Sequence, residues 1–446
     1  MYRFLYLQIF SLIGILLFTG WPDARGLAEE PETSAQPPTP EMRLSLRTAM
    51  QVSVEQNPTV QLSRQRITES RAASMTQLGA MLPHFSGNVT ASNRRFFLGN
   101  FGGIPTVSDD FDFYGTRAFL TQNLLSMSLI QRWQASRAGI EVAEYELEVT
   151  KRDTMASVAL IYLEALSFEE AVKARRANVL LNEQLLRLAS ERKAAGMATS
   201  LDVTRAKVQL ENEKQRLVVA RTEMGRAKLN LIRAMGIPFE VKIFLTDELK
   251  LINVPQQTPE DAMLVAMANR VELEAQARRQ RLANLTLSSV KSERLPSLHG
   301  TGDVGLVGLQ PSDVLTTHNL ELLLSIPIFD GGQREGRISE SRSQVRQEDI
   351  RAKDIRLQVT LEVREALLTL DAAKQEVAVA EEGRLQALKE VELARERFAV
   401  GVATNIEVTN AQTSLAVARD NVIRALFNFN ASRVNLARAQ GRLQDL

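Results

Sequence analysis

The sequence predicts a mainly α-helical fold with a smaller β part, built from one unit that occurs twice along the chain. Three observations lead to this prediction: a long internal repeat, an apolar pattern with coiled-coil spacing, and short segments in which polar and apolar residues alternate. The composition agrees, because aromatic residues make up only 5% of the chain and cysteine is absent. Long helices with narrow apolar contact lines need fewer large side chains than a broad globular core.

The first residues have the pattern of an export signal. Arg3 precedes an almost wholly apolar run from Phe4 to Gly20, and small residues follow at the spacing of a signal-peptidase site. We therefore expect a signal peptide at 1–26 and a Pro-rich leader at 27–41. An N-terminal membrane anchor is the alternative for the apolar run.

The internal repeat covers most of the chain. Glu191–Gly236 aligns without a gap with Glu396–Gly441, which lies 205 positions later, and 16 of the 46 aligned positions are identical. A period this long indicates a duplicated domain and not an array of small repeats. We expect a first repeat at 42–240 with a β-hairpin at about 84–125, a linker at 241–258, and a second repeat at 259–446 with a β-hairpin at about 297–328.

Each repeat is predicted to contain very long helices. No proline occurs between Pro105 and Pro238 or after Pro327, and proline breaks helices because it lacks a donor and clashes with the preceding turn. In the second copy, apolar residues from Val359 to Phe398 recur at alternating steps of four and three, with one interruption at Arg384. This is a heptad pattern. A helix from about Gln333 to Val400 would be on the order of 100 Å long.

Between these helices lie segments with a period of two, which predicts strands. They are His84–Ser92, Phe111–Leu125, Leu298–Gly308 and Asn319–Ile328, with loops expected at Gly99–Asp110 and Leu309–His318. Four strands cannot close on themselves, and an open sheet leaves unpaired edges. Three copies with four strands each would close a twelve-stranded barrel, although two or four copies satisfy the same argument.

The composition argues against several classes of function. The formal net charge is +1 and no long run of Lys and Arg occurs, so we expect no nucleic-acid binding. Three scattered histidines and no cysteine leave no pattern for a metal site, and no residue constellation suggests an enzyme or a cofactor. Gly300, Gly302 and Gly305 fit the G-x-G-x-x-G pattern, but they fall on a predicted strand with no helix opening at the glycines.

The repeated segment contains a predicted helix–turn–helix in each copy. A glycine suits the left-handed residue that ends the first helix. A threonine three residues later can cap the second helix, and an acidic residue three positions further on completes a capping box. These residues are Gly196, Thr199 and Asp202 in the first copy and Gly401, Thr404 and Glu407 in the second.

Taken together, these features resemble the TolC-like outer-membrane efflux channels. The resemblance rests on the duplication, on Leu82-Pro83 and Leu295-Pro296, on Ser325–Gly332 (SIPIFDGG), and on the paired turns. It implies a homotrimer with a twelve-stranded outer-membrane barrel and an α-helical periplasmic tunnel, serving as the passive exit duct of a tripartite efflux or type I secretion system. The implied partners are a periplasmic adaptor (membrane fusion) protein, an inner-membrane pump or ABC exporter, and outer-membrane lipid.

The resemblance also implies roles for the turns. Asp202, Glu407 and Asn410 match positions of the periplasmic entrance gate, with Asn410 standing where the family has an aspartate. The turn residues expected to dock the adaptor are Gly196, Met197, Gly401 and Val402. The alternative function is an exported periplasmic coiled-coil tether without a pore, which would not need the alternating hairpins.

Overall fold

The computed structural model describes residues 41–255 and 257–445. The expected signal peptide at 1–26 and nearly all of the Pro-rich leader lie outside the described residues. From Glu41 onward the chain forms one unit by its internal contacts.

The same series of elements occurs twice in this unit. The first series is β1 (Glu41–Leu44), α2 (Leu46–Gln56), α3 (Pro58–Gly79), β2 (His84–Arg94), β3 (Phe97–Phe101), β4 (Ile104–Val107), β5 (Phe111–Leu125), α4 (Met127–Ala194) and α5 (Ser200–Met235). The second series is β6 (Lys242–Leu245), α6 (Pro259–Asn269), α7 (Val271–Lys291), η1 (Ser292–Arg294), β7 (Ser297–Gln310), β8 (Asp313–Ser325), α8 (Gln333–Ala399), α9 (Asn405–Ala439) and η2 (Leu443–Asp445). In the part of the chain that the structure describes, a hairpin of β3 and β4 occurs in the first series and has no counterpart in the second.

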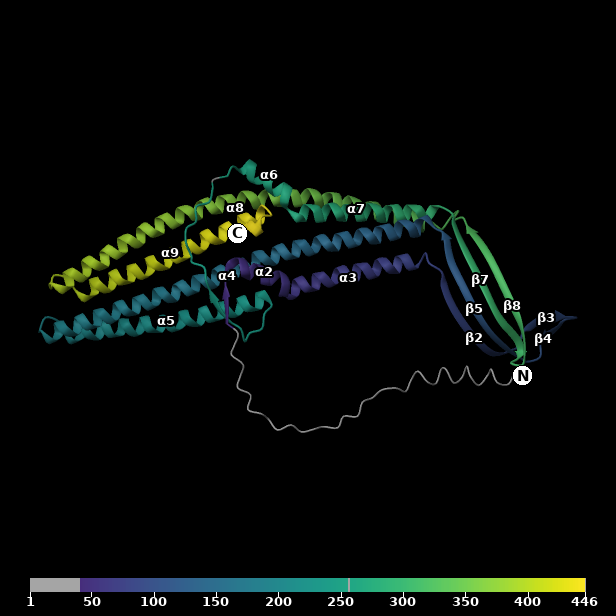
Figure 1. Cartoon of the computed structure of the whole chain (residues 1–446), viewed down its shortest axis with the longest axis horizontal. Helices are drawn as coiled ribbons and strands as arrows, with labels where there is room; N and C mark the ends of the chain where they lie inside the picture. The colour runs from purple at the N-terminus through teal and green to yellow at the C-terminus, as the bar shows by residue number, and fades with distance from the viewer. Residues whose placement is uncertain (1–40, 256, 446) are drawn as a thin grey trace, which may run out of the picture. The chain divides into compact units, whose positions relative to one another are not determined.

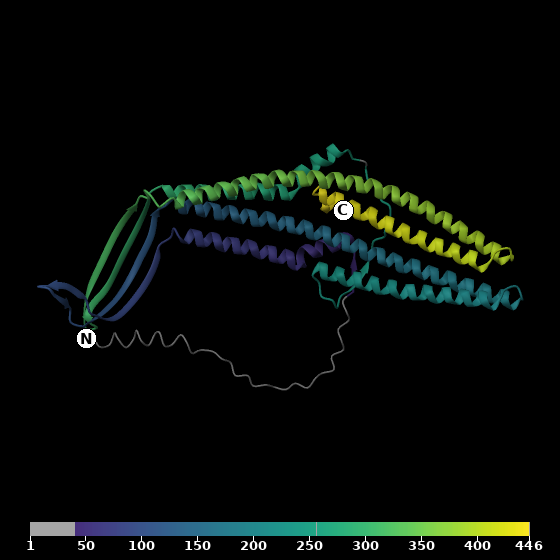
Figure 2. The same ribbon diagram turned by 180° about the vertical axis from the view of Figure 1, so that it is seen from behind.

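Strands and helices follow one lateral order (Figure 1). The four-stranded antiparallel sheet has the order β2-β5-β7-β8. The helices that run directly into these strands pack in the same order, α3-α4-α7-α8. Beyond the ends of α3 and α7, α5 packs along α4 and α9 along α8, so two helical hairpins extend away from the sheet (Figure 2). Along the sheet and the adjoining helices, the chain is therefore a wall one element thick.

The sheet has one apolar and one polar face, because directly paired residues on neighbouring strands share a face. Phe85 pairs with Leu120, and Leu298 pairs with Leu324 on the apolar face. The exposed large side chains of this face are Phe85, Val89, Leu120, Leu124, Val304, Leu306, Leu320, Leu322 and Leu324. The opposite face is mainly polar, although Phe119, Leu315 and Leu323 also lie on it. Its polar residues are His84, Ser86, Asn88, Thr90, Arg117, Thr121, His299, Thr301, Asp303, Thr317, Asn319 and Glu321.

Two of the expected loops are corrected by the structure. Leu309–His318 is not a loop, because β7 and β8 continue to a turn of two residues, Pro311 and Ser312. The strand expected at Asn319–Ile328 instead begins at Asp313 and ends at Ser325, since Pro327 has no N–H for a ladder. The expected loop Gly99–Asp110 contains most of the β3–β4 hairpin.

The strand β7 contains the three glycines that imitate a dinucleotide motif. Gly305 lies between strands on both sides, with Arg117 and Thr317 as its direct neighbours. A Cβ atom at Gly305 would lie 2.6 Å from Cγ of Arg117 and even closer to the backbone of Thr116. Gly305 therefore serves close strand pairing.

The long helices have the expected apolar seam. In α8, Val359 and Val363 are fully buried, and buried residues continue at heptad spacing to Phe398. Arg384, the interruption of the seam, is half-buried and pairs with Glu381 one turn earlier at 2.6 Å. Among the described residues, none of the helices has an apolar stretch that could traverse a lipid bilayer.

A small parallel sheet ties the two repeats together at mid-length. β1 pairs with β6, which lies within the expected linker 241–258. Tyr162 of α4 is fully buried beneath this pair and donates its hydroxyl hydrogen to the oxygen of Leu44 (3.0 Å) or Asp247 (2.9 Å). Burial, and then the Asp247 carboxylate, raises the pKa of the Tyr162 hydroxyl.

Candidate functional site

The predicted site residues lie in the two turns that close the helical hairpins. In the first turn, α4 ends at Ala194 and Gly196 has φ 76°. The amide of Met197 donates to the carbonyl of Arg192 at 2.8 Å, which closes the end of the helix. A left-handed residue at this position favours glycine, because a Cβ atom would be strained.

Thr199 begins the next helix with the expected capping box. Its Oγ1 accepts from the amide of Asp202 (3.3 Å), while the Asp202 carboxylate accepts from both the amide (3.0 Å) and the hydroxyl (2.7 Å) of Thr199. The bond from the Thr199 hydroxyl, followed by that from its amide, lowers the pKa of Asp202. The Asp202 carboxylate is therefore favoured in its charged form, and it is directed toward the N-terminal cap of its own helix.

The second turn repeats this geometry with looser contacts. Gly401 has φ 87°, and Thr404 accepts from the amide of Glu407 at 3.4 Å. The Glu407 carboxylate accepts from the Thr404 amide at 3.4 Å and lies 3.7 Å from the guanidinium of Arg397. The sequence pattern thus predicts both caps correctly.

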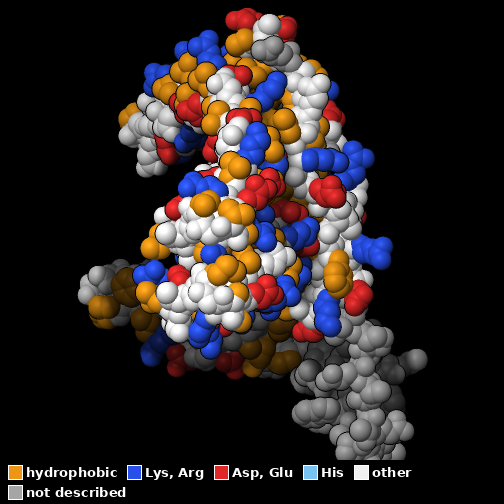
Figure 3. All heavy atoms as spheres, turned by 90° about the vertical axis from the view of Figure 1, so that its left-hand side faces the viewer, with side chains coloured by type: hydrophobic (Ala, Val, Ile, Leu, Met, Phe, Trp, Pro, Cys, Tyr) orange, Lys and Arg blue, Asp and Glu red, His pale blue; other side chains and the backbone are white. Residues whose placement is uncertain are grey.

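Apolar side chains are exposed at both turns. Met197 is 62% exposed and Val402 is 65% exposed, although each follows directly on a glycine in a short turn. Figure 3 views the chain from this end and shows hydrophobic side chains mixed with charged ones of both signs. Exposed apolar groups at a charged surface are typical of contact sites for another protein.

The gate residues expected from the resemblance are not hydrogen-bonded to each other among the described residues. Within the described residues, Asp202 and Glu407 share no hydrogen bond. The turns meet through Asn405, whose side-chain amide donates to the carbonyl of Asp202 at 3.0 Å. Asn410 is exposed and, with Arg205, lines a crevice between α5 and α9.

Arg192 is a further residue at the end of the chain formed by the two turns, which is called the tip below. The sequence alone does not single it out. Its side chain is buried, with the guanidinium 4.5 Å from the centre of the Phe398 ring. It donates to the carbonyl oxygen of Phe398, and a second, longer bond reaches the oxygen of Met197 at 3.4 Å. The signal that could have found it is an arginine four residues before the turn glycine in both copies.

Above the tip, the two hairpins meet along a polar seam. Asn178 and Asn182 of α4 and Gln412 of α9 are buried. Arg419 donates to Oδ1 of Asn178 at 2.6 Å, and burial lowers the pKa of its guanidinium. Nearer the turns, the two hairpins also share an apolar cluster, in which Leu185, Ala189 and Ala206 pack with Phe398 and Val408. Buried polar contacts give less cohesion than apolar ones when they are incompletely paired.

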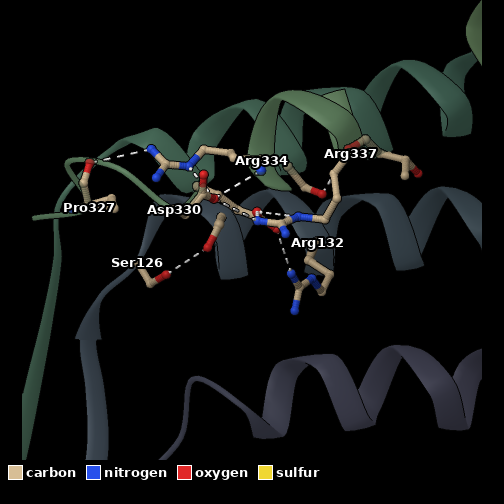
Figure 4. Close-up of polar contacts among 10 residues, drawn as sticks. Ser126, Arg132, Pro327, Asp330, Arg334 and Arg337 are labelled. Atoms are coloured by element: carbon tan, nitrogen blue, oxygen red, sulfur yellow. Dashed lines mark hydrogen bonds and ion pairs between the residues drawn. The ribbon is translucent and has the colours of Figure 1, made fainter. Parts of the chain in front are cut away.

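A second concentration of charge lies where strands become helices (Figure 4). Glu293 accepts from Arg337 at 2.7 and 3.1 Å and lies 3.5 Å from Arg132. Asp330 accepts from the amide of Arg334 at 3.0 Å, which fixes the first turn of α8. This set, with Arg294 and Glu335 paired at 2.5 Å, is called the junction cluster below.

Comparisons with known proteins agree on one family. The family model described as "Outer membrane efflux protein" matches residues 49–237 and 264–442, which run from within α2 to just after α5 and from within α6 to just after α9. The pyoverdine export outer membrane protein OpmQ of Pseudomonas aeruginosa is 21% identical over 384 residues, covering 84% of this chain and 80% of OpmQ. The outer membrane protein TolC of Escherichia coli is 21% identical over 344 residues, covering 73% of this chain and 69% of TolC. The solved structure of the Campylobacter jejuni CmeC outer membrane channel matches with a TM-score of 0.77 and 16% identity, over 89% of this chain and 86% of CmeC.

Proposed function

Because the chain belongs to the outer membrane efflux protein family, we propose that it forms, as a homotrimer, the outer-membrane exit duct of a tripartite efflux or type I secretion system. The observation that carries the proposal is the wall one element thick, in which four strands continue into four helices in one lateral order. A wall of this kind has two open sides and cannot bury its own faces. It gains a closed interior only when copies join edge to edge.

The edges of the sheet support this assembly. β2 and β8 are the outer strands of the four-stranded sheet, so each has one side without a partner strand among the described residues. Unpaired N–H and C=O groups along a strand are costly where water is absent. Pairing β8 of one copy with β2 of the next would satisfy both edges, and three copies would give a closed ring of twelve strands around the polar face.

The two faces of the sheet fit such a position. The apolar face, with Phe85 at 78% and Leu320 at 83% exposure, would meet lipid. The polar face would line a water-filled path, with the Arg117 and Asp303 ion pair and the Glu321 carboxylate on its wall. The outer membrane is therefore the proposed location, with the helices reaching into the periplasm. The proposed signal peptide at 1–26 would direct the export of the chain.

The turns are proposed as the periplasmic entrance. Asp202, Glu407 and Asn410 would repeat three times around the axis and form the gate. Met197 and Val402, with Gly196 and Gly401 shaping the turns, would dock a periplasmic adaptor protein. The exposed side chains of Met197 and Val402 support this role, because apolar groups exposed at a charged surface are typical of contact sites for another protein. An inner-membrane pump or ABC exporter would supply the energy, and the duct itself would be passive.

The test begins with the native mass of the protein extracted in mild detergent from purified outer membranes. The proposal expects a detergent-dependent species of three chains that conducts ions across planar lipid bilayers. Conductance should change when Asp202→Asn and Glu407→Gln are combined, while Arg226→Gln, far along α5, should leave it unchanged. A species that stays in solution without detergent and never conducts would overturn the duct in favour of the periplasmic tether.

A further inference from the structure

The junction cluster lies at the border of the apolar sheet face. Past the last residue of β8, Ile328 and Phe329 remain 92% and 84% exposed. On the neighbouring elements, Leu125 and Leu295 at the corresponding border are about half exposed. Charged side chains begin immediately beyond this level, within the first two turns of α4 and α8 and in η1.

Positive charge is in excess at this level. The segments 127–132, 291–294 and 330–337 contain five cations against three anions. The cations are Arg132, Lys291, Arg294, Arg334 and Arg337, and the anions are Glu293, Asp330 and Glu335. This balance differs from that of the whole chain, in which 54 basic residues face 53 acidic ones.

The pairing within the cluster leaves Arg132 least satisfied. Both short bonds to Glu293 come from Arg337, and Arg132 reaches the same carboxylate only at 3.5 Å. Its side chain is 47% exposed and that of Arg337 is 45% exposed. Figure 4 shows the side chains of Arg132 on α4 and of Arg337 on α8. Two forked donors beside a shared carboxylate leave N–H groups free for a further anion.

We propose that Arg132 and Arg337 bind the headgroup phosphate of an anionic phospholipid in the leaflet nearest the helices. The proposal rests on the outer-membrane position proposed above. A lipid fits better than a free anion, because its phosphate lies at the edge of the hydrocarbon layer, at the level where the apolar face gives way to arginine. Arginine matches phosphate oxygens with two parallel N–H donors. Arg132 lies on α4, an inner helix of the row, so it is away from the edges where copies would meet.

The test measures lipid retained by the detergent-extracted trimer in native mass spectrometry. Trimers are exchanged into micelles with phosphatidylglycerol or with zwitterionic phosphatidylcholine. We expect preferential retention of phosphatidylglycerol, reduced about five-fold by Arg132→Gln and further by Arg132→Gln with Arg337→Gln. Arg132→Lys keeps the charge and should retain more lipid than Arg132→Gln. Arg226→Gln removes one arginine on α5, far from the cluster, and should retain lipid as the parent does.

Three outcomes would overturn the lipid site. Equal retention in the glutamine variants and the parent would exclude Arg132 and Arg337 as the contact. Full displacement by inorganic phosphate would identify a site for free anions. Loss of the trimer in the variants would make the cluster a contact between copies. The trimer mass and the conductance of the parent are read in the same samples, so a failure of the duct itself would be seen separately.

Discussion

Arg192 of α4 donates a hydrogen bond to the carbonyl oxygen of Phe398 near the end of α8 and covers the ring of the same residue. The duplicated counterpart of Arg192 is Arg397, 205 positions later. Arg397 instead stays 59% exposed and lies near Glu407 of its own hairpin. One position of the ancestral repeat therefore has two different tasks, and only the first of them joins the two hairpins.

The first prediction concerns this link. Arg192→Ala removes a buried charged donor from the Phe398 carbonyl, which then keeps the bond from the Gly401 amide at 3.2 Å. We expect a local loss of about 1.5–3 kcal/mol, the range for hydrogen bonds to charged groups. Hydrogen exchange of the amides at 196–202 and 400–407 should accelerate in both turns. Arg397→Ala is the matched control, and a comparable effect from it would contradict the assignment.

The second prediction concerns the caps and pH. Because its folded pKa is lowered by Thr199, Asp202 stabilises the turn above the unfolded pKa of about 3.9, and this contribution is lost as pH falls through the folded value. Protection of the first turns of α5 should thus be constant across neutral pH and decline only in strong acid. Thr199→Ala should cost about 1 kcal/mol and remove this acid response. Thr404→Ala should lower the stability by less, because the hydrogen bonds of the Thr404 cap are longer. A larger loss from Thr404→Ala than from Thr199→Ala would contradict this prediction.

The third prediction concerns Gly305. Gly305→Ala forces a Cβ atom against the backbone of β5 and against Cγ of Arg117. We expect a loss of at least about 2 kcal/mol and a lower yield of folded protein, since overpacked sites relax poorly. The measure is the unfolding temperature by circular dichroism. Gly87→Ala on β2 is the control, because its Cβ would meet open space; equal losses in both variants would refute the close-approach argument.

The fourth prediction concerns the small parallel sheet of β1 and β6. Tyr162→Phe leaves the Leu44 and Asp247 oxygens without the hydroxyl donor while keeping the ring. We expect a loss of about 0.5–1.5 kcal/mol in the free energy of unfolding, the net contribution of one hydrogen bond, because the Leu44 oxygen still accepts from the Thr246 amide and the Asp247 carboxylate from the Leu46 amide. Chemical denaturation gives this value. Tyr145→Phe, whose hydroxyl accepts from Arg278 at 3.3 Å in a less buried place, should cost less.

The sequence predicts the helices of this fold better than its strands. Prolines and the heptad steps bracket α8 within one residue, because helix periodicity is a local property. The ends of β8 are predicted less well, since its polar residues from Asp313 to His318 look like a loop until β7 is seen to pair with them. Strand ends depend on partners that are distant in sequence.

At the turns, too, local contacts can be predicted from the sequence and long-range contacts cannot. Gly196, Thr199 and Asp202 interact within seven residues, so their geometry can be predicted from spacing. The link from Arg192 to Phe398 joins residues 206 positions apart, and no local rule predicts it. The junction cluster is equally non-local, because Glu293 forms ion pairs with Arg132 of the first repeat and Arg337 of the second.

The pairing of β5 with β7 also sets an order of events for the newly made chain. Residues 114–125 must wait for residues 298–308, so nearly two hundred residues of chain separate the halves of one ladder. Contacts this distant in sequence form slowly, because loop closure must occur before they can stabilise anything. Until the chain has been made past Ser325, β2 and β5 can pair only with each other, and the apolar face of their hairpin stays exposed. Such a hairpin is only marginally stable and prone to aggregate, so the wall can be assembled only after β7 and β8 have been made.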